Sequence, residues 1–281
     1  MRRYAPAIAL ALTLIVGANI ALAAKVLTAE TRTHWNEDRL LTILAIGSDM
    51  GLPRVGNPLN GRADAIHLIA VDTKKLRATI VDVPRDSYIS GDKVNAFLQS
   101  GGPERMVSVM QSYSGVKIDY YVLTSFRGLR GLVSGIGGVP ITLEAPIRDA
   151  ASRANLRGGA QKLGSAEALA FARARKAVAG GDFGRSRHQG ELIRAAHKRL
   201  RDLDTGLLST TRRLATFSRN TITDIPQAEL FRMAALALDI KPANIKQVSL
   251  SGPTGFVGAA SVVHLQAGSA FSDIRNGKVG P

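Results

Sequence analysis

Residues 65–83 read AIHLIAVDTKKLRATIVDV, two apolar runs separated by the polar segment DTKK at residues 72–75. Short apolar runs that are bounded by polar turn residues are typical of buried strands. We therefore expect strands at Ala65–Val71 and Leu76–Val83. Because the polar segment between them is short, the two strands are predicted to form an antiparallel hairpin.

Further elements flank this hairpin on both sides. Apolar runs predict strands at Leu41–Ile46, Ile118–Leu123 and Val139–Leu143. Apolar residues at helical spacing predict helices at Glu104–Tyr113 and Ser125–Ile136. Strands that alternate with helices indicate a layered α/β domain.

The second half of the chain is predicted to be mostly helical. A glycine pair at residues 180–181 separates an alanine-rich helix from a long basic one, since adjacent glycines break a helix. The expected elements are helices at Ala166–Arg173, Arg185–Leu203, Thr210–Ser218 and Gln227–Leu238, followed by strands at Gln247–Leu250 and Ser261–Leu265. No linker or internal repeat interrupts this pattern, so one domain is expected over residues 37–281.

The N-terminal segment has the features of a membrane signal. Arg2 and Arg3 precede an uncharged run, Tyr4–Ala24, which is just long enough to cross a bilayer as a helix and ends before Lys25. The arginine pair should stay in the cytoplasm, which places the rest of the chain outside the cell membrane. We expect a single-pass signal anchor at residues 1–27 and a linker at residues 28–36; a cleaved signal peptide and a buried helix are the alternatives.

The composition restricts the partners without selecting one. The 281 residues carry a formal net charge of +15, which favours polyanions such as nucleic acid, anionic lipid, phosphate esters or an acidic wall polymer. Aromatic residues make up only 5%, too few for a base-stacking surface, so no nucleic-acid partner is expected. The chain has no cysteine, which excludes disulfides, cysteine zinc sites and a thiol nucleophile.

Acidic and basic side chains stand at predicted strand ends, where ligands bind in α/β sheets. Asp49 follows the first strand, Arg62 and Asp64 precede the next, and Arg85 follows the third. Asp49 and Asp64 are candidates to hold Mg²⁺ through carboxylate oxygens. Arg62 and Arg85 are candidates to bind phosphate oxygens through paired N–H donors. The alternative is that Asp49 caps a turn and Arg62 pairs with a neighbouring acid.

The segment Phe171–Arg201 is strongly cationic and supplies further candidates. Arg173 and Arg175 lie two residues apart, so both can reach one ligand only if the chain leaves the helix there. Arg185 and Gln189 stand at the start of the following helix, where free backbone N–H groups favour an anion. A solvated basic face or a polymer-binding patch is the alternative.

Seven short motifs follow one another along the chain from about Leu41 to its end. They are LAIGSD (44–49), GRAD (61–64), VPRD (83–86), KVNA (93–96), IDYY (118–121), GGV (137–139) and GGDFGR (180–185) with Gln189. Each motif alone is weak, but the seven in this order resemble the LytR-CpsA-Psr family of cell-wall phosphotransferases.

The resemblance implies an α-β-α domain with a central mixed sheet and an apolar cavity for a polyprenyl-pyrophosphate-linked glycan. It implies transfer of the phosphoglycan to a peptidoglycan hydroxyl, with polyprenyl phosphate as the leaving product. Asp49 and Asp64 fall where the family binds Mg²⁺ and, with Arg85, are the expected catalytic residues. The positions that match the pyrophosphate contacts of the family are Arg62, Arg85, Arg173, Arg175, Arg185 and Gln189. Helical residues such as Met106, Met110, Leu132 and Ile136 are candidates to line this cavity, and ordinary core packing is the alternative for each of them.

Two positions depart from the family pattern. Gly51 stands where the family often has arginine, and His188 stands where arginine usually precedes the glutamine. Arg187 is one residue away and would point about 100° from that position on a helix. The alternative functions are an exported binding protein for lipid-linked glycan or anionic polymer, and a lipid pyrophosphatase. The two aspartates disfavour the binding protein, because polymer binding needs only positive charge.

Overall fold

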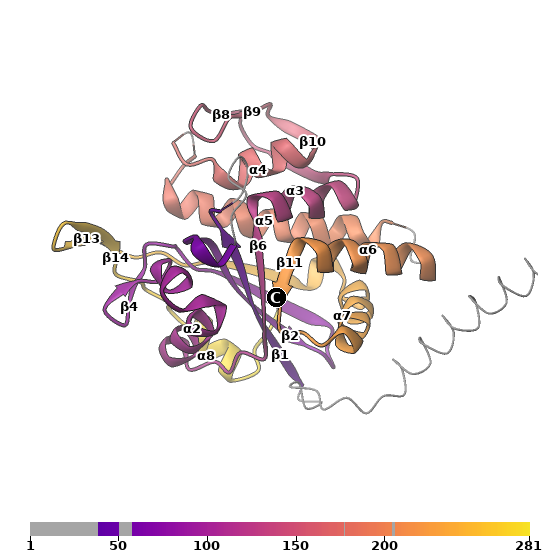
Figure 1. Ribbon diagram of the computed structural model, residues 1–281, viewed down its shortest axis with the longest axis horizontal. Coiled ribbons are helices and arrows are strands. Elements are labelled where there is room, and N and C mark those ends of the chain that lie inside the picture. Colours follow the sequence, from indigo (N-terminus) through magenta and orange to yellow (C-terminus); the bar gives the residue numbers. More distant parts are fainter. Residues whose placement is uncertain (1–38, 51–57, 177, 204–205) are drawn as a thin grey trace, which may run out of the picture.

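The computed structural model describes residues 39–50, 58–176, 178–203 and 206–281 (Figure 1). The expected signal anchor and linker lie outside these ranges, as does Gly51. Of the helices in the described ranges, none is both long enough and apolar enough to span a bilayer.

A mixed sheet of six strands forms the centre of the domain. Its strands are β1 (Leu40–Ser48), β2 (Ala63–Asp72), β3 (Arg77–Asp82), β6 (Tyr120–Ser125), β11 (Thr221–Thr223) and β12 (Ile245–Ser249). They lie in the order β11-β6-β1-β2-β3-β12. The predicted hairpin is confirmed, because β2 and β3 pair antiparallel. Strand β1 is antiparallel to β2 and parallel to β6, so the sheet is mixed.

Helices cover both faces of the sheet, because side chains alternate across each strand. The helices are α2 (Ala96–Ser114) and α8 (Ala270–Arg275) on one side, and α5 (Asp182–Arg201), α6 (Leu207–Asn220) and α7 (Gln227–Asp239) on the other (Figure 1). In β1, Leu44 and Ile46 belong to the core shared with α2 and α8. Leu41 and Ile43 alternate with them and pack with residues of α5 and α7. Each face of the sheet therefore has its own hydrophobic core.

A third core lies at one end of this layered arrangement. It contains α3 (Phe126–Gly135), α4 (Ser165–Arg173), β7 (Val139–Leu143), β8 (Ile147–Asp149), β9 (Ala154–Leu156) and β10 (Gly159–Leu163). Strand β7 was expected from its apolar run, and it pairs with β10 instead of joining the central sheet. Gly137 and Gly138 precede it with φ values of 69° and 94°, a turn that strongly favours glycine and redirects the chain.

Short elements complete the fold. They are the 3-10 helices η1 (Pro58–Asn60) and η2 (Pro242–Asn244), and the hairpins β4 (Tyr88–Ile89) with β5 (Asp92–Lys93) and β13 (Thr254–Val257) with β14 (Ala260–Val263). The two strands expected near the C-terminus correspond to β12 and β14. Of these, only β12 belongs to the central sheet, where it runs parallel to β3.

Helix α5 lies directly on the sheet at Gly190. A Cβ atom at this residue would be 2.2 Å from Asp82 Oδ1 and 2.4 Å from Gln247 Nε2, far closer than side-chain carbons approach other atoms. The Gln247 amide also donates to the backbone oxygen of Arg187 at 2.8 Å. Because Asp82 and Gln247 belong to β3 and β12, these contacts set the height of the helix above the sheet.

We expect Gly190→Ala to lower the free energy of unfolding by about 1–3 kcal/mol, because the added methyl group would force helix and sheet apart. Urea denaturation measures this loss. Gly158→Ala is the control, since a Cβ atom there would meet nothing closer than 3.6 Å. Equal stability of the two variants would contradict the close contact between α5 and the sheet.

Candidate functional site

A cavity of about 900 Å³ lies between the sheet and the helices α3, α5, α6 and α7. Its floor is the sheet face that carries Ile43, Ala45, His67, Ile69 and Val122. The small side chain of Ala45 at the middle of the floor leaves space that a larger residue would fill. The cavity therefore arises from the spacing of the two layers and from small residues on the sheet.

The two ends of the cavity differ in chemistry. At one end, which we call the charged end, the lining residues are Asp49, Asp64, Asp149, Arg173, Arg175, Lys176, Arg185 and Gln189. Towards the other end they include Leu132, Ile136, Ile193, Leu200, Leu214, Phe217, Met233 and Leu238. Two of the four residues expected to line the cavity, Leu132 and Ile136, do so. Met106 and Met110 do not, because they are fully buried in the core on the opposite face of the sheet.

The loop after β1 is held against the loop before β2. Asp49 Oδ1 accepts a hydrogen bond from the backbone N–H of Arg62 at 2.8 Å, and the Asp49 N–H donates to the Arg62 carbonyl at 3.0 Å. A Cβ atom at Gly61 would be 2.2 Å from Ser48 Oγ, so this approach requires glycine. The Arg62 side chain is exposed and is not part of the cavity lining. Asp49 therefore does hold a turn, which the sequence analysis gave as the alternative to metal binding, and it lines the cavity as well.

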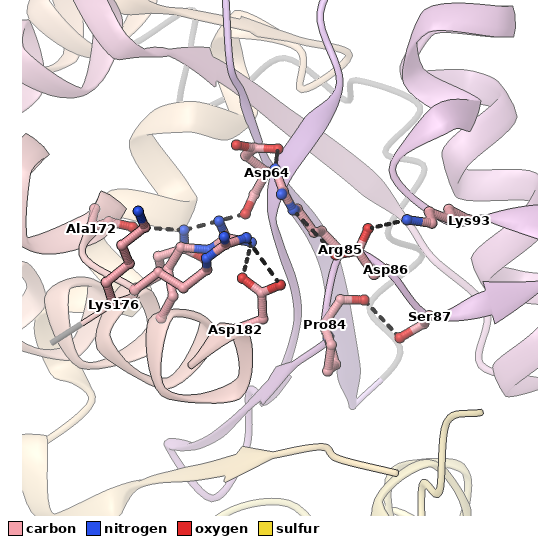
Figure 2. Close-up of polar contacts among 12 residues, drawn as sticks. Asp64, Pro84, Arg85, Asp86, Ser87, Lys93, Ala172, Lys176 and Asp182 are labelled. Atoms are coloured by element: carbon pink, nitrogen blue, oxygen red, sulfur yellow. Dashed lines mark hydrogen bonds and ion pairs between the residues drawn. The ribbon is translucent and has the colours of Figure 1, made fainter. Parts of the chain in front are cut away.

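Arg85 lies beside the cavity and pairs with Asp64 (Figure 2). Its Nη1 is 2.6 Å from Asp64 Oδ1, and its Nε is 3.6 Å from Asp86 Oδ2. Burial lowers the pKa of Arg85, but the adjacent carboxylates, Asp64 first, raise it to a value above the ordinary one. Asp86 is also 3.0 Å from Lys93 Nζ. Arg85 therefore remains charged next to the cavity.

The KVNA motif at residues 93–96 connects the loop that carries Arg85 with the start of β2, where Asp64 lies. The N–H of Asn95 donates to the Arg85 carbonyl at 3.1 Å, and its own carbonyl accepts from the N–H of Ala63 at 3.1 Å. Val94 N–H donates to the Ser87 carbonyl at 2.8 Å. The motif is thus a backbone connection between the ends of β2 and β3.

Helix α4 ends at Arg173, so the chain leaves the helix between Arg173 and Arg175. This is the condition under which both arginines can reach one ligand. Arg173 lies over the Phe126 ring at 4.8 Å. The buried carboxylate of Asp149 then holds the next segment, accepting hydrogen bonds from the backbone N–H groups of Arg175 at 2.8 Å and Lys176 at 3.0 Å. These hydrogen bonds, the one from Arg175 first, lower the pKa of Asp149. Both arginines line the same cavity as a result.

Helix α5 begins at Asp182, earlier than expected, so Arg185 lies in its first turn and Gln189 in its second. Arg185 Nη2 is 3.0 Å from Asp182 Oδ1, and Arg175 Nη1 is 3.7 Å from Asp182 Oδ2. Burial lowers the pKa of Arg185, and the positive charge of Arg85 lowers it further. The guanidinium groups of Arg85 and Arg185 therefore repel each other, and an anion bound between them would reduce this repulsion.

Gln189 connects three elements. Its Nε2 donates to the carbonyl of Ala172 at 2.9 Å and to the carbonyl of Asp64 at 3.3 Å. The amide nitrogen therefore joins α5 to α4 and β2, while its side chain also lines the cavity. Contact between Gln189 and a pyrophosphate stays a prediction.

His188, one of the two departures from the family pattern, is buried. Its ring stacks on Phe171 with centroids 4.4 Å apart and planes 17° apart. Burial, and next the charge of Arg187, lower the pKa of His188 to about 4, so the ring is neutral at neutral pH. Arg187 itself is exposed, pairs with Glu191 at 3.5 Å and is not among the cavity-lining residues. It does not occupy the position of the missing arginine.

The carboxylates of the charged end can hold a divalent cation together with a ligand. Asp49 follows the end of β1, Asp64 lies at the start of the neighbouring strand β2, and both line the same end of the cavity. The described part of the chain contains no group of three or more His, Cys, Asp or Glu residues placed to hold a metal by themselves. Mg²⁺ needs only one or two carboxylates when substrate phosphates and waters complete its octahedron, so the pair fits this ion.

The structure thus brings together most of the residues predicted from the sequence. Asp49, Asp64, Arg173, Arg175, Arg185 and Gln189 line the charged end, and Arg85 contacts Asp64. Arg62 is exposed and contributes its backbone. Sequence reasoning missed Asp149 and Asp182, which hold Arg175 from two sides. Asp182 belongs to the quoted GGDFGR motif, whereas nothing in the local sequence marks Asp149.

A layered α/β domain with a cavity that is charged at one end and mostly apolar along the rest defines a protein that can hold an amphiphilic anion. The particular family follows from comparison: residues 17–276 match the LytR_cpsA_psr family, and the chain belongs to it. The polyisoprenyl-teichoic acid–peptidoglycan teichoic acid transferase TagV of Bacillus subtilis is 29% identical over 153 residues, which are 50% of this chain. That match spans only 39% of TagV.

Solved structures share the fold. Protein gbs0355 of Streptococcus agalactiae superposes with a TM-score of 0.75 at 25% identity, covering 88% of this chain and 91% of that one. TagT bound to LIIa-WTA superposes with a TM-score of 0.70 at 20% identity, covering 85% and 91%. The central mixed sheet and its helical layers are therefore the fold of this family.

We expect stability to fall as the pH decreases from about 6.5 to about 4, because the unfolded chain then binds a proton that buried His188 excludes. The shift is equivalent to about 3 kcal/mol between those pH values. In His188→Phe, which keeps a ring on Phe171, this part of the pH dependence should disappear. Urea denaturation of both proteins across this range measures the difference, and parallel curves would contradict the buried neutral histidine.

Proposed function

We propose that this protein is a glycopolymer–peptidoglycan phosphotransferase, which moves a phosphoglycan from a polyprenyl-pyrophosphate-linked precursor onto peptidoglycan. The observation that carries the proposal is the cavity with a charged end and a mostly apolar remainder. Membership of the LytR-CpsA-Psr family and the teichoic acid transferase activity named for TagV support it.

The apolar part of the cavity suits a polyprenyl chain. Burial of each CH₂ group contributes about 0.8 kcal/mol, so a long hydrocarbon chain needs a protein or lipid environment. Residues such as Leu214, Phe217 and Met233 on α6 and α7 provide it. We propose that the polyprenyl chain of the donor lies along α5 in this space, with the pyrophosphate of the donor at the charged end.

The charged end suits the pyrophosphate. Arg175 and Arg185 share the carboxylate of Asp182, and Arg85, from a distant part of the sequence, pairs with Asp64 beside them. Each guanidinium group can offer two N–H donors to phosphate oxygens in a fixed geometry. Positive charge held in place stabilises the charge that develops during phosphoryl transfer.

We further propose that Asp49 and Asp64 hold Mg²⁺ with the substrate. When bound there, the ion would neutralise negative charge on the phosphate oxygens. In the reaction a peptidoglycan hydroxyl oxygen forms a bond to the phosphorus that carries the glycan, while the bond from that phosphorus to the bridging oxygen breaks. Polyprenyl phosphate leaves with the bonding electrons, and the proton of the attacking hydroxyl is released to solvent. The arginines bind and orient the pyrophosphate throughout.

The location of this reaction follows from its substrates and from the N-terminal sequence. A lipid-linked donor resides in a membrane, and peptidoglycan lies outside the cytoplasm. We propose that Tyr4–Ala24 anchors the chain in the cytoplasmic membrane and that the domain acts on its outer side.

We expect Arg85→Lys to lower the rate of transfer at least about tenfold, because lysine keeps the charge but loses the paired N–H donors. The assay incubates the purified chain with a lipid-pyrophosphate glycan, peptidoglycan and Mg²⁺, and measures glycan attached to peptidoglycan. Exposed Arg148 provides the matched control, Arg148→Lys, which should retain the wild-type rate. Release of soluble phosphoglycan instead would indicate a pyrophosphatase, and an unchanged lipid donor would indicate a binding protein.

We expect Asp49→Asn and Asp64→Asn to lose the part of the turnover that depends on divalent cations, with little change in melting temperature, because an amide is a poorer Mg²⁺ ligand. The control is Asp92→Asn, which replaces an exposed carboxylate on β5. Its turnover should depend on divalent cations as that of the wild-type chain does. The two-carboxylate metal site would be wrong if both variants kept full activity in the presence of a chelator, or if both unfolded.

A further inference from the structure

His67 occupies an unusual place on the floor of the cavity. Across the sheet, direct pairing places Val122, Ala45, His67, Asp82 and Ser249 in one row over five strands. The first three residues of this row line the cavity, whereas Asp82 and Ser249 lie to one side of it. His67 is therefore the point at which a polar row of side chains reaches the cavity.

The fully buried carboxylate of Asp82 holds the imidazole in one orientation. His67 Nδ1 is 2.8 Å from Asp82 Oδ1, while Gln247 Nε2 and Ser249 Oγ donate to Asp82 Oδ2 at 2.7 and 2.6 Å. Helix α5 covers the group through Gly190. Since a carboxylate accepts hydrogen bonds, Nδ1 carries a proton, and Nε2 is the ring nitrogen left for a ligand.

His67 Nε2 is buried and has no hydrogen-bond partner among the residues that the structure describes. Buried polar atoms in folded proteins are nearly always satisfied, so an unpaired one beside a cavity can take a polar ligand group where such a group reaches it. The network behind the ring is complete, whereas the ring lines the cavity on its other side with Nε2 unpaired among the described residues.

The position of His67 along the cavity identifies that group. On β2 the lining residues run in the order Asp64, Ala65, His67 and Ile69, and on α5 they run Arg185, Gln189, Ile193 and Leu200. The hydrogen bond from Gln189 to the Asp64 carbonyl and the packing of Gly190 on Asp82 align the two series. His67 thus lies where the lining changes from charged to apolar.

We propose that His67 Nε2 donates a hydrogen bond to the phosphate that adjoins the polyprenyl chain, the phosphate that leaves with the lipid. The inference rests on the proposed function, because it assumes a lipid pyrophosphate in the cavity. With that phosphate bound, the ring carries protons on both nitrogens, and Asp82 and the phosphate share its positive charge. His67 then recognises the lipid phosphate, while the arginines at the charged end hold the phosphate that is transferred.

The test compares three ligands of equal chain length: farnesyl pyrophosphate, farnesyl monophosphate and farnesol. Their affinities are measured on the full chain in detergent. His67→Asn keeps an amide donor for Asp82 but lacks the second nitrogen. We expect it to bind farnesyl monophosphate about tenfold more weakly, the effect of one charge-assisted hydrogen bond, and farnesol with unchanged affinity.

His197→Asn is the matched control. This histidine also lines the cavity, from the apolar part of α5, and its Nδ1 is likewise buried without a partner among the described residues. Its Nε2 bonds the Ala237 carbonyl at 2.7 Å. Replacement should change the affinities for the monophosphate and for farnesol by the same factor, because no phosphate is expected at that depth.

A second measurement does not depend on a variant. Nitrogen NMR of the wild-type chain at fixed pH should show His67 become doubly protonated when farnesyl monophosphate is added, but not when farnesol is added. A ring that stays singly protonated, or an equal effect of His67→Asn on both ligands, would overturn the inference. If farnesyl pyrophosphate bound tightly and Arg185→Lys weakened it, the proposed function would survive that result. If the wild-type chain bound no phosphorylated ligand, both proposals would fail.

Discussion

The close approach of helix α5 to the sheet sets the geometry on which the cavity depends. At Gly190 the helix backbone rests against the buried Asp82 and Gln247, and no side chain fits between them. Because an α-helix is a rigid element, this contact fixes the turns on either side of it. Towards its N-terminus Arg185 and Gln189 come beside Asp64, and towards its C-terminus Ile193 and Leu200 line the apolar space. One helix thus provides the lining at both ends.

Carboxylates as well as arginines determine the character of the charged end. Asp182 contacts both Arg175 and Arg185, and Asp149 fixes the backbone of the loop between α4 and α5. Guanidinium groups with free rotation would lose entropy on binding an anion, whereas groups already positioned by carboxylates lose less. The acids therefore prepare the arginines for a ligand and, in its absence, offset part of their repulsion.

The sequence predicts some of these features and not others, for physical reasons. The hairpin β2–β3 follows from two apolar runs and a short polar turn, and the residues around the cavity follow from motifs at strand ends. Partners that depend on distant contacts cannot be found this way. The pattern of Val139–Leu143 predicts a strand but does not show which strand pairs with it. The helical spacing of Met106 is the same whether the side chain faces a cavity or a core. Likewise, only the register of β2 against β3 places Asp82 behind His67.

The charge balance of the site bears on how a pyrophosphate can be held. Although the chain has a formal net charge of +15, the charged end and its neighbours are nearly neutral. Six cationic side chains, Arg85, Lys93, Arg173, Arg175, Lys176 and Arg185, meet five carboxylates, Asp49, Asp64, Asp86, Asp149 and Asp182. The neutral ring of His188 adds no charge where the family usually has arginine.

A diester of pyrophosphate brings two negative charges into this setting, and buried charge is costly unless it is compensated. The proposed divalent cation on Asp49 and Asp64 would supply that compensation while Asp64 and Asp182 stay paired with the arginines. A proton on His67 would add to it at the phosphate nearest the lipid. In a near-neutral site the proposed donor would therefore be held better together with Mg²⁺ than by arginine alone.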